Sequence, residues 1–182
     1  MKSIILVGYM CAGKTTVGKS LAKNMGVDFY DLDWYIEDRF HKRIPDIFAE
    51  KGEAGFRDIE RRMLHEAAEF ENIVLSCGGG TPCFFDNMEY MNQAGITFYL
   101  KASINTLITH YRLSHTIRPL LKDKSDDELE VFMRSQLRER SSYYEQAQHI
   151  IDVNVLDNYD KIDIIVSQIR KILNRENGKM EN

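Results

Sequence analysis

Eight residues near the start of the chain, Gly8 to Thr15, have the spacing of a phosphate-binding loop. Two glycines bracket four residues, and Lys14 and Thr15 follow the second glycine. An apolar run precedes the loop and a helical pattern follows it, which argues against a chance glycine-rich turn. Such a strand, turn and helix direct backbone N–H groups toward one point at the positive end of a helix dipole. The pattern predicts a polyphosphate site, with Lys14 on the outer phosphates and the Thr15 hydroxyl on Mg²⁺.

Two carboxylates, Asp31 and Asp33, follow the second predicted strand. Alternation in an extended segment would put both on the same side of the chain. Near a phosphate loop, Asp31 would hold Mg²⁺ through water, because Mg²⁺ keeps much of its hydration shell. Asp33 would accept a hydrogen bond from an attacking hydroxyl and take its proton. The alternative is that Asp33 only caps the helix that begins near Trp34.

Three successive glycines, Gly78 to Gly80, follow the apolar run Ile73–Ser76. Glycines have no Cβ, so a ligand would be able to touch the backbone amides where the chain leaves the sheet. The alternative is a flexible turn that ends a strand, and Pro82 favours that interpretation. We expect ligand approach, because a tight turn rarely needs three glycines.

Three arginines are candidates for anion binding, because guanidinium groups bind carboxylates and phosphates bidentately. Arg57 lies at the start of a predicted helix, Arg118 lies in a segment without a clear period, and Arg140 lies late in a long helical pattern. Glu60, three residues beyond Arg57, is placed to hold that guanidinium. The alternative for each arginine is a solvated surface residue, and for the pair an exposed ion pair of little energetic weight.

Short apolar runs alternate with longer helical patterns, which predicts a parallel sheet with helices on both faces and ligands beyond the carboxyl ends of its strands. Strands are expected at Ser3–Val7, Phe29–Leu32, Ile73–Ser76, Thr97–Leu100 and His149–Val153. Helices are expected at Lys14–Met25, Trp34–Phe70, Phe85–Gln93, Ile104–Leu113, Asp126–Gln146 and Lys161–Asn174. Gly26 and Gly95 follow two of these helices and are predicted to be left-handed caps.

The 182-residue length predicts a single domain over residues 1–175, followed by a disordered tail over 176–182. Residues of about 112–124 break the alternation and are predicted to form a mobile lid, with a plain connector as the alternative. A formal net charge of −4 without a basic run disfavours a nucleic-acid partner. The apolar runs are too short for a membrane span, and three cysteines without a C-x-x-C pair favour a reducing cytoplasm.

Taken together, these features resemble the shikimate kinase family, over Met1 to about Asp152. The phosphate loop itself is shared by many kinases and discriminates little. More specific are the Gly52-Glu53…Phe56-Arg57…Ile59-Glu60 stretch, the triple glycine, Arg118-Pro119-Leu120-Leu121, and Arg140…Tyr144. The resemblance implies a three-layer α/β P-loop NTPase fold of the nucleoside-monophosphate-kinase type. Its five-stranded parallel sheet would have the order 2-3-1-4-5, with helices on its faces and a small lid.

The resemblance also implies a phosphotransferase that uses ATP and Mg²⁺ to phosphorylate the 3-hydroxyl of shikimate, in the route to chorismate and the aromatic amino acids. The family is usually monomeric. By position, Lys14, Asp33 and Arg118 would be catalytic, and Thr15 and Asp31 would bind Mg²⁺. The ATP phosphates would be bound by Cys11, Ala12, Gly13, Lys14, Thr15, Thr16 and Arg118. Shikimate would be bound by Asp33, Arg57, Gly79, Gly80 and Arg140, with Arg57 and Arg140 on its carboxylate.

Two positions depart from the family pattern. Cys11 stands where the family commonly has glycine, and Arg140 is followed by Ser-Ser-Tyr rather than a proline-containing version. A gluconate- or nucleotide-phosphorylating kinase is the nearest alternative, although a neutral or purely phosphate-bearing acceptor needs no carboxylate clamp. A nucleotide-binding module without turnover is a second alternative, but the sequence has no N-K-x-D guanine-recognition motif. No adenine-contacting residue is assigned after Asp152.

Overall fold

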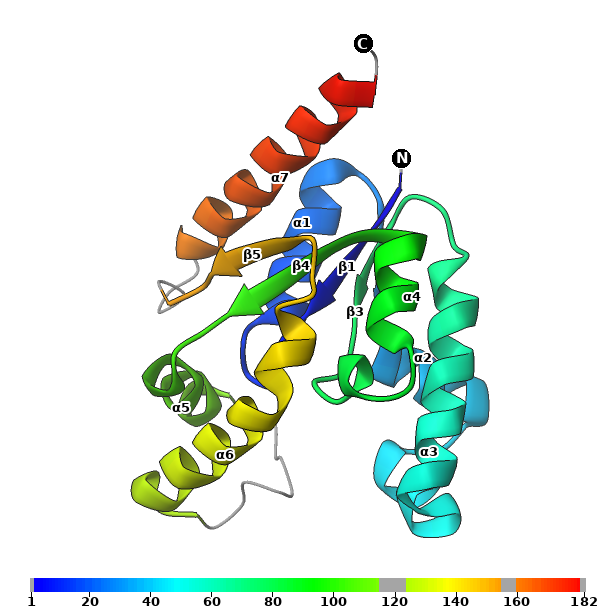
Figure 1. Cartoon of the computed structure of the whole chain (residues 1–182), viewed down its shortest axis with the longest axis vertical. Coiled ribbons are helices and arrows are strands. Elements are labelled where there is room, and N and C mark those ends of the chain that lie inside the picture. Colours follow the sequence, from blue (N-terminus) through cyan, green and yellow to red (C-terminus); the bar gives the residue numbers. More distant parts are fainter. Residues whose placement is uncertain (1, 115–123, 155–159, 181–182) are drawn as a thin grey trace.

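The structure is a computed structural model that describes residues 2–114, 124–154 and 160–180. Strands and helices alternate along the chain (Figure 1). The strands are β1 (Ser3–Val7), β2 (Asp28–Asp31), β3 (Ile73–Ser76), β4 (Gly95–Lys101) and β5 (His149–Asp152). The helices are α1 (Lys14–Met25), α2 (Leu32–Phe40), α3 (Ile44–Ala68), the 3₁₀ turn η1 (Thr81–Cys83), α4 (Asn87–Ala94), α5 (Ile104–Leu113), α6 (Asp126–Tyr144) and α7 (Asp160–Met180).

The five strands form one parallel sheet in the order β2-β3-β1-β4-β5. This is the predicted order and the predicted fold class. All five residues of β1 are buried, as expected for the central strand of a sheet covered on both faces. Figure 1 shows α1 beside α7, α3 beside α4 and α5 beside α6, and each of these pairs is in contact. The β1 and β4 arrowheads point toward the end of the molecule that carries α5 and α6.

Several elements have the bounds that periodicity predicts, among them β1, β3, α1 and α5. The pattern expected as one helical block over Trp34–Phe70 is instead two helices. The first helix, α2, is capped at its end by His41, whose φ of 50° is left-handed. The second, α3, has Pro45 in its first turn. A further break lies inside α3 at Gly52, with φ 67° and ψ −179°. Continuous helical spacing of apolar residues therefore hides both interruptions. Helix α7 continues to Met180, so its backbone includes residues 176–180, for which the sequence predicts a disordered tail.

The two glycines predicted to be left-handed caps behave differently. Gly26 has φ 68°, and its N–H is directed at the carbonyls of Ala22 and Lys23, which confirms that prediction. The prediction is wrong for Gly95, which has an extended φ of −153° and begins β4. A Cβ built on Gly95 would lie 2.5 Å from the carbonyl oxygen of Ser3. Gly95 still caps α4, with its N–H directed at the Met91 carbonyl, but glycine is needed there for the close approach between strands and not for a left-handed φ.

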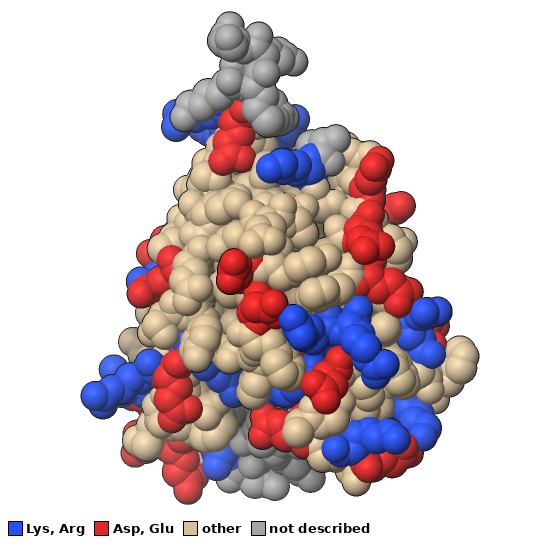
Figure 2. All heavy atoms as spheres, turned by 45° about the vertical axis from the view of Figure 1, so that its right-hand side comes forward, with Lys and Arg blue, Asp and Glu red and all other residues tan. Residues whose placement is uncertain are grey.

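Charged residues of both signs lie intermixed on the face shown in Figure 2, where Lys and Arg side chains form no separate basic patch. This pattern accords with the formal net charge of −4. Within residues 2–114, 124–154 and 160–180, no helix is long and apolar enough to cross a membrane.

Candidate active site

The loop between β1 and α1 is closed by the lysine that follows it. The Lys14 ammonium donates hydrogen bonds to the carbonyl oxygens of Gly8 (2.8 Å) and Tyr9 (2.9 Å). Gly13 has φ 87°, and α1 begins directly after it. Lys14 is buried, so its charge is held inside the loop at the positive end of the helix dipole. This is the electrostatic environment that a polyphosphate requires.

The outer part of the loop is a turn over residues 9–12. The Ala12 N–H donates to the Tyr9 carbonyl at 3.2 Å, and Cys11, the third residue of the turn, has φ 64°. Ala12 is buried and Cys11 half-buried, whereas Thr16 in the first turn of α1 is exposed. The residues predicted to bind ATP phosphates therefore form one continuous surface, apart from Arg118, which lies outside the described residues together with 115–123 of the predicted lid.

Thr15 and Asp31, the predicted metal ligands, are hydrogen-bonded to each other. The Thr15 hydroxyl donates to Asp31 Oδ2 at 2.9 Å. The other carboxylate oxygen, Oδ1, accepts from the Asp33 N–H at 3.2 Å, so Asp31 is the N-cap of α2. A hydroxyl and a carboxylate are hard oxygen donors of the kind that Mg²⁺ prefers. Among the described residues, no three His, Cys, Asp or Glu side chains are grouped so that they could hold a metal ion, but Mg²⁺ commonly takes its other ligands from water and phosphate. These two residues fit the ion.

Asp33 does not lie in an extended segment. Strand β2 ends at Asp31, and Asp33 belongs to the first turn of α2. The prediction that alternation aligns the two carboxylates is therefore wrong, and so is the alternative that Asp33 is the cap. The helical turn nevertheless keeps Asp33 at the same sheet edge, because a Cβ built on Gly78 would lie 2.9 Å from Asp33 Oδ1.

The next two glycines of the turn are each in close contact with a different partner. A Cβ on Gly79 would lie 3.2 Å from the backbone nitrogen of Met10 in the phosphate loop. A Cβ on Gly80 would lie 2.8 Å from a guanidinium nitrogen of Arg57. The turn is therefore packed between the phosphate loop on one side and Arg57 on the other. Close packing within the chain is thus one reason for the three glycines, and the approach of a ligand to their backbone stays a prediction.

Arg57 is held in place by several groups. Its NH1 donates to Glu60 Oε2 at 2.8 Å, and its NH2 lies 3.4 Å from Glu53 Oε1. The guanidinium carbon lies 4.0 Å from the centre of the Phe84 ring. The side chain of Arg57 is 12% exposed and that of Glu60 only 2%, so the alternative of a routine exposed ion pair is wrong. The Nε of Arg57 is buried without a hydrogen-bond partner among the described residues.

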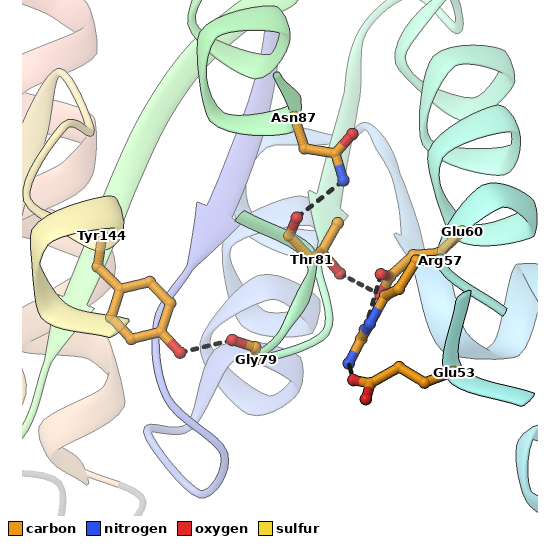
Figure 3. Close-up of polar contacts among 7 residues, drawn as sticks. All are labelled: Glu53, Arg57, Glu60, Gly79, Thr81, Asn87 and Tyr144. Carbon is orange, nitrogen blue, oxygen red and sulfur yellow. Dashed lines mark hydrogen bonds and ion pairs between the residues drawn. The ribbon is translucent and has the colours of Figure 1, made fainter. Parts of the chain in front are cut away.

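A chain of buried polar groups continues from Glu60 (Figure 3). The Thr81 hydroxyl donates to Glu60 Oε1 at 2.6 Å, and the amide of Asn87 donates to the Thr81 carbonyl at 2.8 Å. Thr81 and Asn87 are both fully buried. Each oxygen of the Glu60 carboxylate thus has one donor, Arg57 or Thr81, and buried carboxylates need such partners.

Helix α6 brings Arg140 and Tyr144 to the Gly78–Gly80 turn, on the side opposite Arg57. The helix starts with a capping box between Ser125 and Glu128. At its other end, the buried Tyr144 hydroxyl donates to the Gly79 carbonyl at 2.5 Å (Figure 3). One turn earlier, the guanidinium carbon of Arg140 lies 6.0 Å from the centre of the Tyr9 ring. Tyr144 therefore ties α6, and with it Arg140, to the glycine turn.

Cys83 lies within electrostatic reach of both arginines. Burial raises the pKa of its thiol to about 11, against the opposing effects of Arg140 first and Arg57 second. Fully buried Cys77 lies at the end of β3, where burial raises its thiol pKa, and the charges of Glu60 and Asp31 raise it further.

Comparison with known proteins agrees with this geometry. The family model described as shikimate kinase matches residues 10–173. A shikimate kinase of Phocaeicola vulgatus is 50% identical over 175 residues, which cover 96% of this chain and 100% of that protein.

The chain belongs to the shikimate kinase family. Two solved shikimate kinases are similar in structure. That from Bacteroides thetaiotaomicron has a TM-score of 0.92 at 48% identity, covering 95% of this chain and 98% of the other. That from Acinetobacter baumannii, in complex with shikimate, has a TM-score of 0.82 at 34% identity, covering 96% and 94%.

Sequence reasoning missed three residues that organise this shikimate kinase site. Thr81 and Asn87 read as ordinary turn and helix residues, and nothing in their spacing indicates that they satisfy Glu60. Tyr144 was part of the family resemblance without an assigned role. An apolar helical face that ends in a tyrosine near an arginine is the one available signal, since buried tyrosine hydroxyls usually find a partner.

Replacing Thr81 by valine keeps the side-chain volume but removes the donor to buried Glu60. We expect a loss of about 1–3 kcal/mol in the free energy of unfolding, because a buried oxygen loses its partner. We also expect a raised KM for the acceptor, because Glu60 positions Arg57. Urea unfolding and steady-state kinetics measure both, with Thr81→Ser as the variant that keeps the hydroxyl. Equal stability and kinetics for the valine and serine variants would contradict this role.

Replacing Gly80 by alanine tests the packing of the turn against Arg57. Its φ of −88° suits any residue, so the backbone tolerates the change, but the new Cβ must displace the guanidinium. We expect the acceptor KM to rise about tenfold, the weight of one charge-assisted hydrogen bond, with the ATP KM little changed. Gly55→Ala on α3 is the matched steric control, because its Cβ comes equally close, 2.8 Å, to the Lys51 Cβ and not to the Arg57 guanidinium. An unchanged acceptor KM for Gly80→Ala would show that Arg57 is not held there for the acceptor.

Proposed function

We propose that this chain transfers the γ-phosphoryl group of ATP to the 3-hydroxyl of shikimate, giving shikimate 3-phosphate and ADP. The observation that carries the proposal is the glycine turn, which is in close contact with Asp33 at Gly78, with the phosphate loop at Gly79 and with Arg57 at Gly80. A carboxylate, a polyphosphate site and a buried guanidinium are thus brought to one sheet edge. A small anionic polyol is the acceptor that such a combination suits, because it presents both hydroxyls and a carboxylate.

Each predicted residue has a role in this reaction. Arg57 and Arg140 bind the shikimate carboxylate, while the backbone at Gly79 and Gly80 contacts the ring. Asp33 accepts the hydrogen bond of the attacking hydroxyl and takes its proton as the new oxygen–phosphorus bond forms. The bond from the γ-phosphorus to the bridging oxygen breaks at the same time, and ADP leaves.

Charge on the transferring group is neutralised by cations, because phosphoryl transfer depends on positioning and electrostatics more than on covalent catalysis. Lys14 would leave the carbonyls of Gly8 and Tyr9 for the outer phosphates, and Arg118 would add a second positive charge. When bound, Mg²⁺ would neutralise phosphate charge, held by Thr15 and, through water, by Asp31. A hollow of about 470 Å³ adjoins Thr15 and lies open toward the start of α7, which leaves room beside the loop for a nucleotide.

The proposal includes a monomeric enzyme that works in the cytoplasm without a nucleic-acid or membrane partner. A single domain over residues 1–175 accords with the one sheet to which all five strands belong.

The decisive experiment is an acceptor screen. ADP release, coupled to NADH oxidation, is measured with Mg²⁺-ATP and shikimate, gluconate or a nucleoside monophosphate. We expect turnover with shikimate to exceed that with the other acceptors by at least a hundredfold, because its ring holds the carboxylate and the 3-hydroxyl at a fixed separation, whereas gluconate is an open chain and a nucleoside monophosphate has no carboxylate. Preference for gluconate or a nucleotide would establish the alternative kinase. Tight ATP binding without turnover on any acceptor would establish a nucleotide-binding module.

Replacing Arg57 by lysine keeps the positive charge beside buried Glu60 but removes the planar fork. We expect the shikimate KM to rise about tenfold to a hundredfold, and the ATP KM to change less than about twofold. The matched control is Arg61→Lys, one turn further along α3, where the arginine pairs with Asp86 at the surface. A larger effect on the ATP KM than on the shikimate KM would mean that Arg57 serves the nucleotide instead.

A further inference from the structure

Cys11 adopts a backbone conformation that its side chain disfavours. It is the third residue of the turn over residues 9–12, and its φ of 64° is the left-handed value that a type II turn requires at that position. Glycine adopts this conformation without a steric penalty, whereas a residue with a Cβ does not. The phosphate loop of this chain therefore needs an additional interaction to hold a shape that a glycine at position 11 would reach more easily.

A side chain from a distant helix makes that interaction. The Nδ1 of His110, on α5, lies 2.8 Å from the carbonyl oxygen of Cys11. A carbonyl oxygen only accepts hydrogen bonds, so Nδ1 carries the proton and donates. Helix α5 is itself fixed at its start, where the Ser103 hydroxyl accepts from the Thr106 N–H. His110 is half-buried, so water competes less for the bond than it would at an exposed site.

We propose that His110 is a positioning residue for the phosphate loop. By donating to the Cys11 carbonyl, it fixes the plane of the peptide between Cys11 and Ala12, and with it the left-handed conformation of Cys11. The loop is then held from two sides: Lys14 binds the carbonyls of Gly8 and Tyr9 from within, and His110 binds the Cys11 carbonyl from α5. The inference rests on the nucleotide binding in the proposed function and extends it to a residue on α5 that acts through the loop backbone.

This role predicts an effect on the nucleotide and not on the acceptor. The Cys11 turn belongs to the loop that would surround the phosphates. Arg57 lies on the other side of the glycine turn, against Gly80. Loss of the His110 bond should therefore weaken nucleotide affinity and leave the acceptor KM unchanged. The effect should also depend on the residue at position 11, because a glycine there needs no help to keep φ positive.

The experiment is a double-mutant cycle between positions 110 and 11. His110→Phe keeps an aromatic ring without the donor, and His110→Asn restores an amide N–H close to the position of Nδ1. Each is made in the wild-type and the Cys11→Gly background. The dissociation constant of Mg²⁺-ADP is measured by calorimetry, and the KM values of ATP and shikimate by steady-state kinetics. Thr109→Ala, at the exposed neighbouring position on α5, is the matched control.

We expect His110→Phe to weaken Mg²⁺-ADP binding about tenfold with Cys11 present and less than about twofold with glycine there. His110→Asn should recover most of the affinity, and the shikimate KM should stay within about twofold. Equal losses in both backgrounds, or no recovery with asparagine, would overturn the inference. Should His110→Phe fail to fold, His110→Ala replaces it under the same criteria. Wild-type protein that binds no Mg²⁺-ADP would instead refute the proposed function.

Discussion

Three segments approach the turn at Gly78–Gly80 more closely than side chains on that turn would allow. A Cβ built on each glycine would lie 2.8–3.2 Å from an atom of Asp33, the phosphate loop or Arg57. The absence of these Cβ atoms is therefore what lets the three segments approach a common centre. Parallel strand order alone places these groups at the same edge of the sheet. The turn then sets their separation. Tyr144 binds the Gly79 carbonyl and fixes the turn against α6 as well, so a fourth element is positioned by the same three residues.

The site also depends on the buried ion pair of Arg57 and Glu60, which requires hydrogen-bond partners from the residues around it. Two charges removed from water stabilise the fold only when their remaining hydrogen-bonding capacity is satisfied. Glu60 meets this condition through Thr81, whose own carbonyl is bound by Asn87. Phe84 covers the guanidinium and limits its access to water. The buried Nε of Arg57 has no partner among the described residues, so the site keeps one donor uncommitted on the guanidinium that we propose to bind a carboxylate.

The family resemblance implies the sheet order, whereas sequence patterns predict many element bounds because a buried parallel strand and an amphipathic helix have distinct periods. These patterns fail where a local backbone interaction determines where an element begins or ends. Asp31 caps α2 two residues earlier than the pattern indicates, and Gly95 follows α4 in an extended conformation that begins β4 instead of a left-handed one. The residues Thr81, Asn87 and His110 escape sequence reasoning for a different reason. Thr81 and His110 act on groups far away in the chain, Asn87 acts on the Thr81 carbonyl across a turn, and no spacing rule indicates any of these contacts.

The two halves of the site are built in different ways. Beside the Lys14 and Thr15 side chains, the proposed phosphate half depends on main-chain groups, so the other side chains of the loop matter chiefly through the backbone conformation that they allow or support. That is why Cys11 can stand at a position suited to glycine as long as an external donor holds its carbonyl. The acceptor half that we propose consists of side chains whose charge and shape would make the contact, as with Arg57 and Asp33. A substitution in the first half can therefore be compensated from another helix, whereas one in the second removes the chemistry itself.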